Sequence, residues 1–151
     1  MMEIKEMIDP KLILFDERIN TKEELFDQAA RLFNSVGIVE NIKKYKKDLF
    51  IRENQTSTGI EDSFGIPHAK SQAVTRPAIA FIKSGPISDY KAIDGTTVEY
   101  SFLIAAPTKG SDEHLMILSS LARLLMHEEF RNKLKEAITP KDIIDIIKTN
   151  Y

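Results

Sequence analysis

The stretch VEYSFLIAAP, residues 98–107, is the part of the sequence that says most about the fold. It is rich in β-branched and aromatic residues and almost wholly apolar at its end, which is typical of a central strand buried on both faces of a sheet. Pro107 ends the strand, because proline has no N–H to donate to a neighbouring strand. We therefore expect a sheet with residues 98–106 at its middle.

Three segments nearer the N-terminus are candidate neighbours of this strand. Residues 77–82 (PAIAFI) form a second apolar run, and residues 12–15 (LILF) form a shorter one. Residues 64–69 (FGIPHA) contain Pro67, which cannot donate a ladder hydrogen bond, so they are predicted to be an edge strand or a strand end. The polar residues 55–63 before them are predicted to be a loop.

Helices are predicted on both sides of the strands in the sequence. Thr21-Lys22-Glu23-Glu24 has the form of a capping box, and apolar residues at helical spacing follow as far as Gly37, which suits a helix C-terminus. A second helix is expected over residues 42–54. A third is expected to open near Ser111 or Asp112. Its apolar face comprises Leu115, Leu118, Leu121, Ala122 and Leu125.

The chain is predicted to end in two more helices. One is indicated by apolar residues between positions 130 and 137, and the last begins at Thr139-Pro140, a start signal. The order is thus two helices, a group of strands and three helices, and no repeat or linker interrupts it. This predicts a single α/β domain over residues 1–151, with a mixed β-sheet flanked by helices.

Composition excludes several classes of protein. The 151 residues are 42% hydrophobic and 29% charged, as in an ordinary globular protein, and the net charge of −2 argues against a general nucleic-acid binder. The absence of cysteine excludes disulfides, thiolate metal ligands and a cysteine nucleophile. The N-terminal residues lack the apolar core of a signal peptide, and no apolar run is long enough to span a bilayer. A cytoplasmic location is therefore the default expectation.

Without cysteine, the three histidines dominate the list of candidate nucleophiles, because much of the histidine side chain is neutral at pH 7. His68 lies in GIPHA, residues 65–69, where small or apolar neighbours leave the ring approachable and Pro67 restricts the backbone. A ring held in one orientation suits in-line phosphoryl transfer. Upstream, Arg52 can bind phosphate oxygens through two donors at once, and Thr58 lies in a loop of hydroxyl groups between Arg52 and His68.

The same residues also have ordinary structural interpretations. A lone histidine after a proline is more often structural, and an arginine near a helix end usually satisfies carbonyl groups. His114 is expected at a helix N-terminus, where the dipole would keep it neutral; it is either a hydrogen-bond donor to a phosphate or a solvated residue. His127 lies at a helix junction and is interpreted as a cap or surface residue. No HExxH-type metal motif is present.

Taken together, the motifs resemble the enzyme IIA domain of the fructose/mannitol class in the bacterial phosphoenolpyruvate-dependent sugar phosphotransferase system. The resemblance covers nearly the whole chain and implies the same mixed sheet flanked by helices. The segments that carry it follow one another in this order: Arg52-Glu53, Thr58-Gly59-Ile60, Ile66-Pro67-His68-Ala69, Asp94-Gly95, residues 102–107 and His114-Leu115.

The resemblance implies a role for each candidate. His68 would be the phosphoryl acceptor, with Arg52 and His114 as the other catalytic residues and with Thr58 and Asp62 as supporting residues near the phosphate. The phosphohistidine of the carrier HPr would donate to His68, and a cysteine of enzyme IIB would then take the group for sugar phosphorylation. Such a phosphotransferase needs no cofactor or metal, because arginine and imidazole stabilise the charge. It would meet the membrane enzyme IIC only through enzyme IIB, and it would bind no nucleic acid.

One segment departs from the family pattern. Many members read Gly-Ile-Gly-x-Gly-Ile-Ala before the Pro-His pair, whereas residues 59–65 here read GIEDSFG. Because carboxylates beside a phosphate dianion would oppose phosphorylation, Glu61 is expected to face solvent. The departure leaves the sugar and the subfamily open. The alternative to sugar uptake is a regulatory protein like the nitrogen-related enzyme IIA proteins. A third interpretation is an interaction module that carries no phosphate, and the presence of Arg52 and His68 disfavours it.

Overall fold

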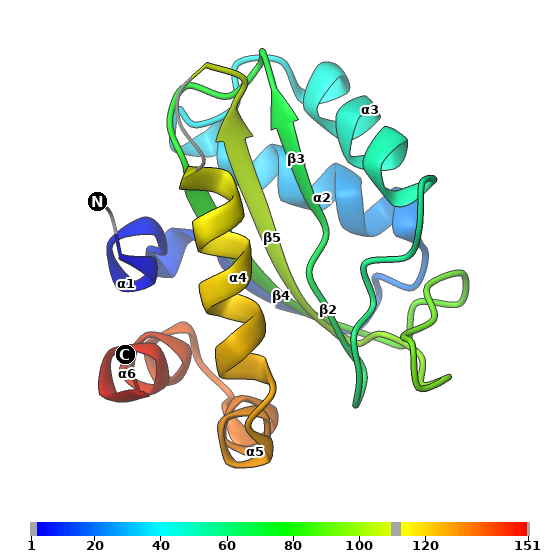
Figure 1. The fold of residues 1–151 in the computed structure, drawn as a ribbon, viewed down its shortest axis with the longest axis vertical. Helices are drawn as coiled ribbons and strands as arrows, with labels where there is room; N and C mark the ends of the chain where they lie inside the picture. Colours follow the sequence, from blue (N-terminus) through cyan, green and yellow to red (C-terminus); the bar gives the residue numbers. More distant parts are fainter. Residues whose placement is uncertain (1–2, 110–112, 151) are drawn as a thin grey trace.

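The computed structural model of the protein describes residues 3–109 and 113–150. Over these residues the chain forms a five-stranded mixed sheet with helices on both faces (Figure 1). The prediction of a mixed sheet flanked by helices is therefore confirmed. The strands are β1 (Ile13–Asp16), β2 (Phe64–Gly65), β3 (His68–Ser71), β4 (Ala78–Ser84) and β5 (Tyr100–Pro107).

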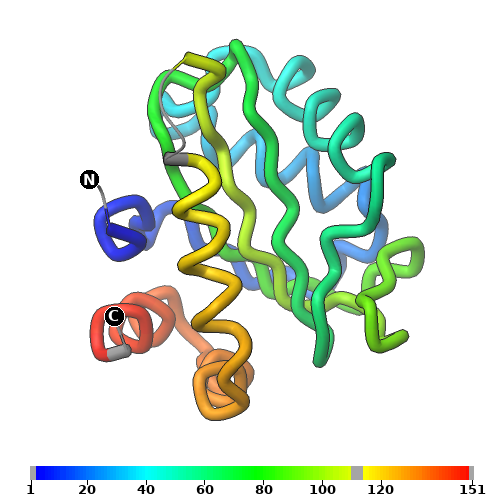
Figure 2. The backbone as a smooth tube through the Cα atoms, in the orientation of Figure 1, coloured from blue at the N-terminus to red at the C-terminus, as the bar shows by residue number. Residues whose placement is uncertain are grey.

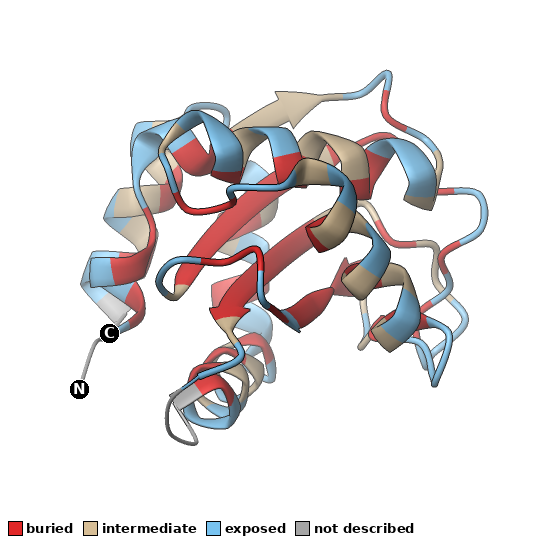
Figure 3. Cartoon of the chain, turned by 90° about the horizontal axis from the view of Figure 1, so that it is seen from above, coloured by how far each residue is buried: buried red, intermediate tan, exposed pale blue. Residues whose placement is uncertain are grey.

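Strand β5 lies at the middle of the sheet, as its composition predicted. β4 pairs antiparallel with it on one side, and β2 and β3 pair parallel with it on the other. β1 pairs parallel with β4 and completes the sheet at the opposite edge. Every residue of β5 between its two ends is buried, because helices cover both faces of the sheet at this strand (Figure 3).

Strands β2 and β3 are two parts of one edge, interrupted at Ile66-Pro67. Pro67 has no N–H, but its carbonyl accepts a hydrogen bond from the N–H of Ile104 at 3.0 Å, so the pairing with β5 continues past it. His68 is the first residue of β3 and lies opposite Ile104. The predicted edge strand is confirmed, and it places His68 beside the central strand of the sheet.

Alternate residues of the strands face two separate apolar cores. In β4, for example, Ala80 and Ile82 pack toward the core beneath the first two helices, whereas Ile79 and Phe81 pack toward the core beneath the others. The helices of the first layer are α2 (Lys22–Ser35) and α3 (Ile42–Glu53). Those associated with the second core are α1 (Ile4–Met7), α4 (Glu113–Leu125), α5 (Glu128–Glu136) and α6 (Pro140–Asn150).

The helix ends largely follow the sequence signals. The Thr21 hydroxyl accepts from the N–H of Glu24 at 3.1 Å, while the Glu24 carboxylate accepts from the N–H of Asn20, one residue further back than an ideal capping box would place it. Gly37 adopts φ of +78°, the left-handed conformation that glycine permits at a helix end. Pro140 begins α6, as predicted.

Two short elements near the N-terminus were not predicted. Residues 4–7 form helix α1, and residues 10–12 form a 3-10 turn, so that Leu12 precedes the strand that it was expected to begin. One helical turn has little stability of its own; α1 forms because Ile4 and Met7 are buried, and it packs beside α6 (Figure 2). The expected helix start at Ser111 or Asp112 lies outside the described residues. Among the helices that are described, none has the length and apolar character to cross a membrane.

Candidate functional site

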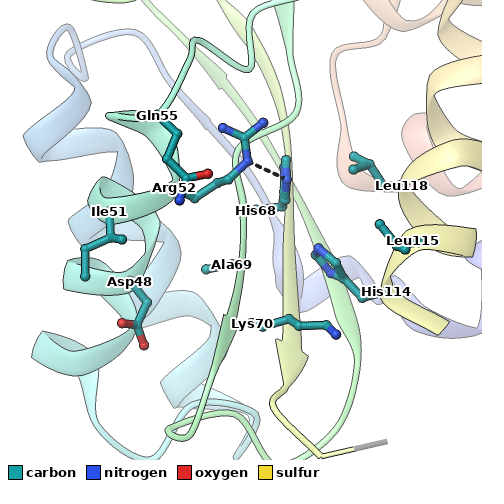
Figure 4. A pocket seen from close by; sticks show the side chains of 10 residues that line it. All are labelled: Asp48, Ile51, Arg52, Gln55, His68, Ala69, Lys70, His114, Leu115 and Leu118. Atoms are coloured by element: carbon teal, nitrogen blue, oxygen red, sulfur yellow. Dashed lines mark hydrogen bonds between the residues drawn. The ribbon is translucent and has the colours of Figure 1, made fainter. Parts of the chain in front are cut away.

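A cavity of about 360 Å³ lies between α3 and α4, with residues of β3 at its base (Figure 4). It brings together three residues that were singled out from separate segments of the sequence, namely Arg52, His68 and His114. The lining residues are Asp48, Ile51, Arg52, Gln55, His68, Ala69, Lys70, His114, Leu115 and Leu118.

The imidazole of His68 is held by a hydrogen bond at each of its nitrogens. Nδ1 lies 2.8 Å from the carbonyl oxygen of Ile66, and Nε2 accepts a hydrogen bond from Nε of Arg52 at 3.2 Å. A carbonyl oxygen can only accept, so Nδ1 carries the proton and Nε2 carries a lone pair. The ring is therefore neutral, with its nucleophilic nitrogen directed toward Arg52.

Arg52 reaches the cavity from the last turn of α3 (Figure 4). Its Nη1 donates to the carbonyl of Thr56 at 3.0 Å, while its Nε contacts His68. Two of its N–H groups thus fix the plane of the guanidinium, and the remaining donors are available to an anion in the cavity.

His114 lies on the side of the His68 ring away from Arg52, on the first turn of α4 (Figure 4). The two ring centroids are 5.3 Å apart. Nδ1 of His114 is buried and has no hydrogen-bond partner among the described residues. Burial lowers the pKa of His114 to about 4, and electrostatic interactions with His68, Lys70 and Arg52 add to the decrease. Burial thus dominates, whereas the sequence argument relied on the helix terminus.

The two histidines of the site, His68 and His114, are expected to make the folded protein less stable as the pH falls. The pKa of His68 is also lowered, chiefly by burial, with the carbonyl of Ile66 acting the other way and Arg52 adding to the decrease. Because unfolded histidine titrates near 6.5, the unfolded chain binds more protons below that pH, and the free energy of unfolding falls as pH falls. The slope reaches at most about 1.4 kcal/mol per pH unit for each ring.

Urea unfolding between pH 7 and pH 4.5 tests this expectation. His114→Gln should flatten the decline, because it removes one of the titrating rings, whereas His127→Gln should leave the slope unchanged. His127 is the matched control, because it is exposed at the N-cap of α5 and makes no side-chain cap hydrogen bond. The prediction that His127 is a cap or surface residue is confirmed. Equal slopes for the two variants would contradict the assignment of His114 as a buried neutral ring.

The Thr58 side chain points away from the cavity, although the sequence suggested support of a phosphate. Its hydroxyl donates to the carboxylate of Glu53 at 2.5 Å and also contacts the hydroxyl of Tyr90. Thr58 is buried and does not line the cavity. Any support that it gives must therefore act through its neighbours.

Asp62 was expected near the phosphate site, and the structure places its carboxylate elsewhere. One oxygen accepts from Nε of Arg131 at 3.0 Å, and the other accepts from the ammonium group of Lys135, both on α5. The two cations neutralise Asp62 away from the lining of the cavity. Glu61 is exposed, as predicted, with an oxygen 3.7 Å from the same arginine.

Seven lining residues were missed as site residues, and their spacing could have revealed several of them. Asp48, Ile51, Arg52 and Gln55 recur at intervals of three and four, as residues on one helix face do. Lys70 is two residues beyond His68 in β3, which places both side chains on the same face of the sheet. Ala69, between His68 and Lys70, was also missed, and Leu115 and Leu118 complete the set of seven on the opposite wall.

Leu115 was predicted to belong to the apolar face of its helix that packs into the core. Instead, 59% of it is exposed, and it lies at the rim of the cavity with Leu118. Leu121 and Leu125, further along the same helix, are buried as expected. Helical spacing alone does not separate the two groups, because Leu115 and Leu118 line the open cavity (Figure 4), whereas Leu121 and Leu125 pack into the second core.

Residues 6–150 match the family described as "Phosphoenolpyruvate-dependent sugar phosphotransferase system, EIIA 2". The chain belongs to this family.

Relatives of this enzyme IIA chain include two named for fructose. It is 36% identical over 137 residues to the "PTS system fructose-specific EIIA component" of Haloferax volcanii, covering 91% of this chain and 89% of the relative. It is 38% identical over 146 residues to the "PTS system fructose-specific EIIABC component" of Bacillus subtilis, covering 97% of this chain. The match spans only 23% of the length of the Bacillus protein.

Two solved structures share the fold of this enzyme IIA chain. The nitrogen regulatory protein IIA-Ntr from Neisseria meningitidis matches with a TM-score of 0.85 and 27% identity, covering 95% of this chain and 98% of that one. The mannitol enzyme IIA from Escherichia coli, solved in complex with phosphorylated enzyme IIB, matches with a TM-score of 0.77 and 19% identity, covering 94% of this chain and 97% of that one.

The departure of residues 59–65 from the family pattern has a structural counterpart. Asp62 and Ser63 adopt φ of 54° and 68°, in the left-handed region, and Ser63 occupies a position at which many members carry glycine. The N–H of Ser63 donates to the hydroxyl of Thr96 at 2.9 Å and helps to hold this conformation. At Gly65, the alanine of the pattern would place its Cβ 2.6 Å from the hydroxyl of Tyr90. Gly65 is thus required by Tyr90.

Proposed function

We propose that this enzyme IIA chain is a phosphocarrier in which His68 accepts a phosphoryl group from phospho-HPr and donates it to a cysteine of enzyme IIB. The observation that carries the proposal is the geometry of His68. The carbonyl of Ile66 holds the proton at Nδ1, so the lone pair of Nε2 is available at the cavity. A neutral, oriented nitrogen at an open cavity is what attack on phosphorus requires.

The transfer balances without a metal. Nε2 of His68 forms a bond to phosphorus while the bond from phosphorus to the donor histidine nitrogen breaks, and the leaving imidazole keeps the electron pair. Arg52 donates to this lone pair at rest, so its guanidinium must move from the ring toward the phosphoryl oxygens as the new bond forms. Arg52 and the N–H of neutral His114 then stabilise the developing charge.

The rim of the cavity supports a protein as the phosphoryl donor. Ile51 and Leu115 are large apolar residues, and they are 50% and 59% exposed on opposite walls. Arg52 and Lys70 add positive charge between them. Exposed apolar residues around a charged centre are typical of a surface that another protein covers.

The second partner is proposed by analogy. The mannitol enzyme IIA with the same fold was solved in complex with phosphorylated enzyme IIB, and the Haloferax and Bacillus relatives are named as fructose-specific components. These relationships support uptake-coupled phosphorylation of a sugar of the fructose/mannitol type.

The experiment is a two-step transfer with radiolabelled phosphoenolpyruvate, enzyme I and HPr. We expect acid-labile label on this chain, followed by its loss to a purified fructose-type or mannitol-type enzyme IIB. A matched enzyme IIB with its cysteine replaced by serine should leave the label in place. No label on this chain, with HPr shown to be phosphorylated in the same reaction, would overturn the proposal.

A regulatory phosphoprotein is the second candidate, and a specific likeness favours it. The Neisseria nitrogen regulatory protein matches with a TM-score of 0.85 at 27% identity. In that case HPr or a related carrier would label His68, but none of the enzyme IIB proteins would remove the label. The second step of the same experiment therefore separates the two functions.

A further inference from the structure

Glu53 is a buried carboxylate that the proposed transfer does not use. It is 5% exposed, it follows Arg52 at the end of α3, and it is not among the residues that line the cavity. No cation forms an ion pair with it within the described part of the chain. A buried charge is costly unless hydrogen bonds replace water, so the contacts of Glu53 indicate what it is retained for.

Those contacts form a directed chain of hydrogen bonds. One oxygen of Glu53 accepts from the N–H of Thr58 at 3.1 Å, and the other accepts from the Thr58 hydroxyl. Since the single hydroxyl proton of Thr58 is used in this way, the buried hydroxyl of Tyr90 must donate to the oxygen of Thr58. The carboxylate is the final acceptor, and hydrogen bonds to an ionised acceptor are the stronger kind.

From Thr58 the connection continues to the reactive ring. The carbonyl of Thr58 accepts from the N–H of Ile66 at 3.1 Å, and the carbonyl of Ile66 accepts from Nδ1 of His68 at 2.8 Å. Thr58 is therefore held at its N–H by Glu53 and at its carbonyl by Ile66. The carbonyl that sets the tautomer of His68 therefore belongs to Ile66, a residue that these hydrogen bonds hold in place.

The same loop also holds Arg52. The guanidinium donates to the carbonyl of Thr56 at 3.0 Å, and Thr56 lies between Glu53 and Thr58. Fixing Thr58 to the end of α3 therefore closes the loop around the arginine. Both groups that form hydrogen bonds with His68, namely the Ile66 carbonyl and the Arg52 guanidinium, are thus linked through this loop to one buried carboxylate.

We propose that Glu53 is a positioning residue that, through Thr58 and Ile66, keeps His68 in its Nδ1-protonated tautomer and Arg52 against Nε2. The inference rests on the proposed phosphocarrier function for its kinetic consequence, but its structural part can be tested in the unphosphorylated protein. Tyr90 belongs to the same hydrogen-bonded group, because its hydroxyl contacts Thr58 and occupies the space that the absent side chain of Gly65 leaves.

Glu53→Gln tests whether the negative charge of Glu53 and the direction of these hydrogen bonds matter. With the amide oxygen facing the N–H of Thr58, the amide N–H groups face the Thr58 hydroxyl, which must then donate to Tyr90 and leave the buried phenol proton without an acceptor. Thr58→Val removes the hydroxyl at constant shape, and Thr58→Ser retains it. Glu40→Gln, at an exposed position before α3, is the matched control.

The decisive measurement is the 15N chemical shift of the two His68 ring nitrogens in the unphosphorylated protein. Wild type, Thr58→Ser and Glu40→Gln should show one protonated Nδ1 and one unprotonated Nε2, whereas Glu53→Gln and Thr58→Val should show averaged shifts from mixed tautomers. In parallel, the two perturbed variants should accept label from phospho-HPr roughly tenfold more slowly or worse at saturating donor, with KM unchanged, because the rim residues are untouched.

The two readouts separate this inference from the proposed function. If wild type takes no label but Glu53→Gln and Thr58→Val still mix the tautomers, the positioning role stands and the phosphocarrier proposal fails. Wild-type ring shifts in folded Glu53→Gln and in Thr58→Val would overturn the positioning role, even if both variants were less stable. If Glu53→Gln does not fold, the comparison of Thr58→Val with Thr58→Ser decides the question alone.

Discussion

His68→Ala is expected to abolish the acid-labile label that phospho-HPr transfers to the wild-type protein. The variant removes the ring whose Nε2 is directed into the cavity with its proton held on the other nitrogen by Ile66. No neighbouring group is expected to replace it, because Nδ1 of His114 is buried and the chain has no cysteine. Label should fall to the level of a reaction without this protein.

His127→Ala is the matched control for this loss, since it removes an exposed histidine at the start of α5. It should be labelled at the wild-type rate. His114→Ala should still be labelled, but more slowly, because it removes a hydrogen-bond donor and leaves the nucleophile. Undiminished label on folded His68→Ala would show that another residue accepts the phosphoryl group.

Arg52→Gln is expected to slow labelling by about 10²–10³-fold, the usual effect of removing one preorganised donor from a transition state. Arg52 is the cation that directly contacts the reactive nitrogen, at 3.2 Å, and its geometry is set by the Thr56 carbonyl. Loss of its charge should also raise the pKa of His68, because Arg52 is one of the causes that lower it. The rate of labelling against pH measures both effects.

Arg52→Lys separates charge from geometry. A lysine keeps the positive charge but has no planar fork, so it should recover only part of the rate. Arg31→Gln is the matched control, because Arg31 is an exposed residue of α2 whose partner is Asp27. If Arg52→Gln and Arg31→Gln were labelled equally fast, Arg52 would have no role in the transfer.

The order and type of the main elements could be predicted because they depend on local composition and periodicity. The apolar run at residues 98–107 is the central strand, and Pro67 marks an edge, since a residue without an N–H cannot take a middle position in a ladder. Thr21, Gly37 and Pro140 mark helix ends through interactions within a few residues of chain. Helix α1 was missed because its stability comes from buried contacts with distant segments.

The candidate site divides in the same way. The sequence by itself indicated the family and the candidate residues, in that a chain with no cysteine carries a Pro-His pair after an arginine, in the order of the enzyme IIA family. Only the tertiary structure decided the tautomer of His68, the depth of His114 and the destination of Asp62, which turns to α5. Each of these depends on which groups from remote segments are within hydrogen-bonding distance and on how far water is excluded, and neither quantity is local in the sequence.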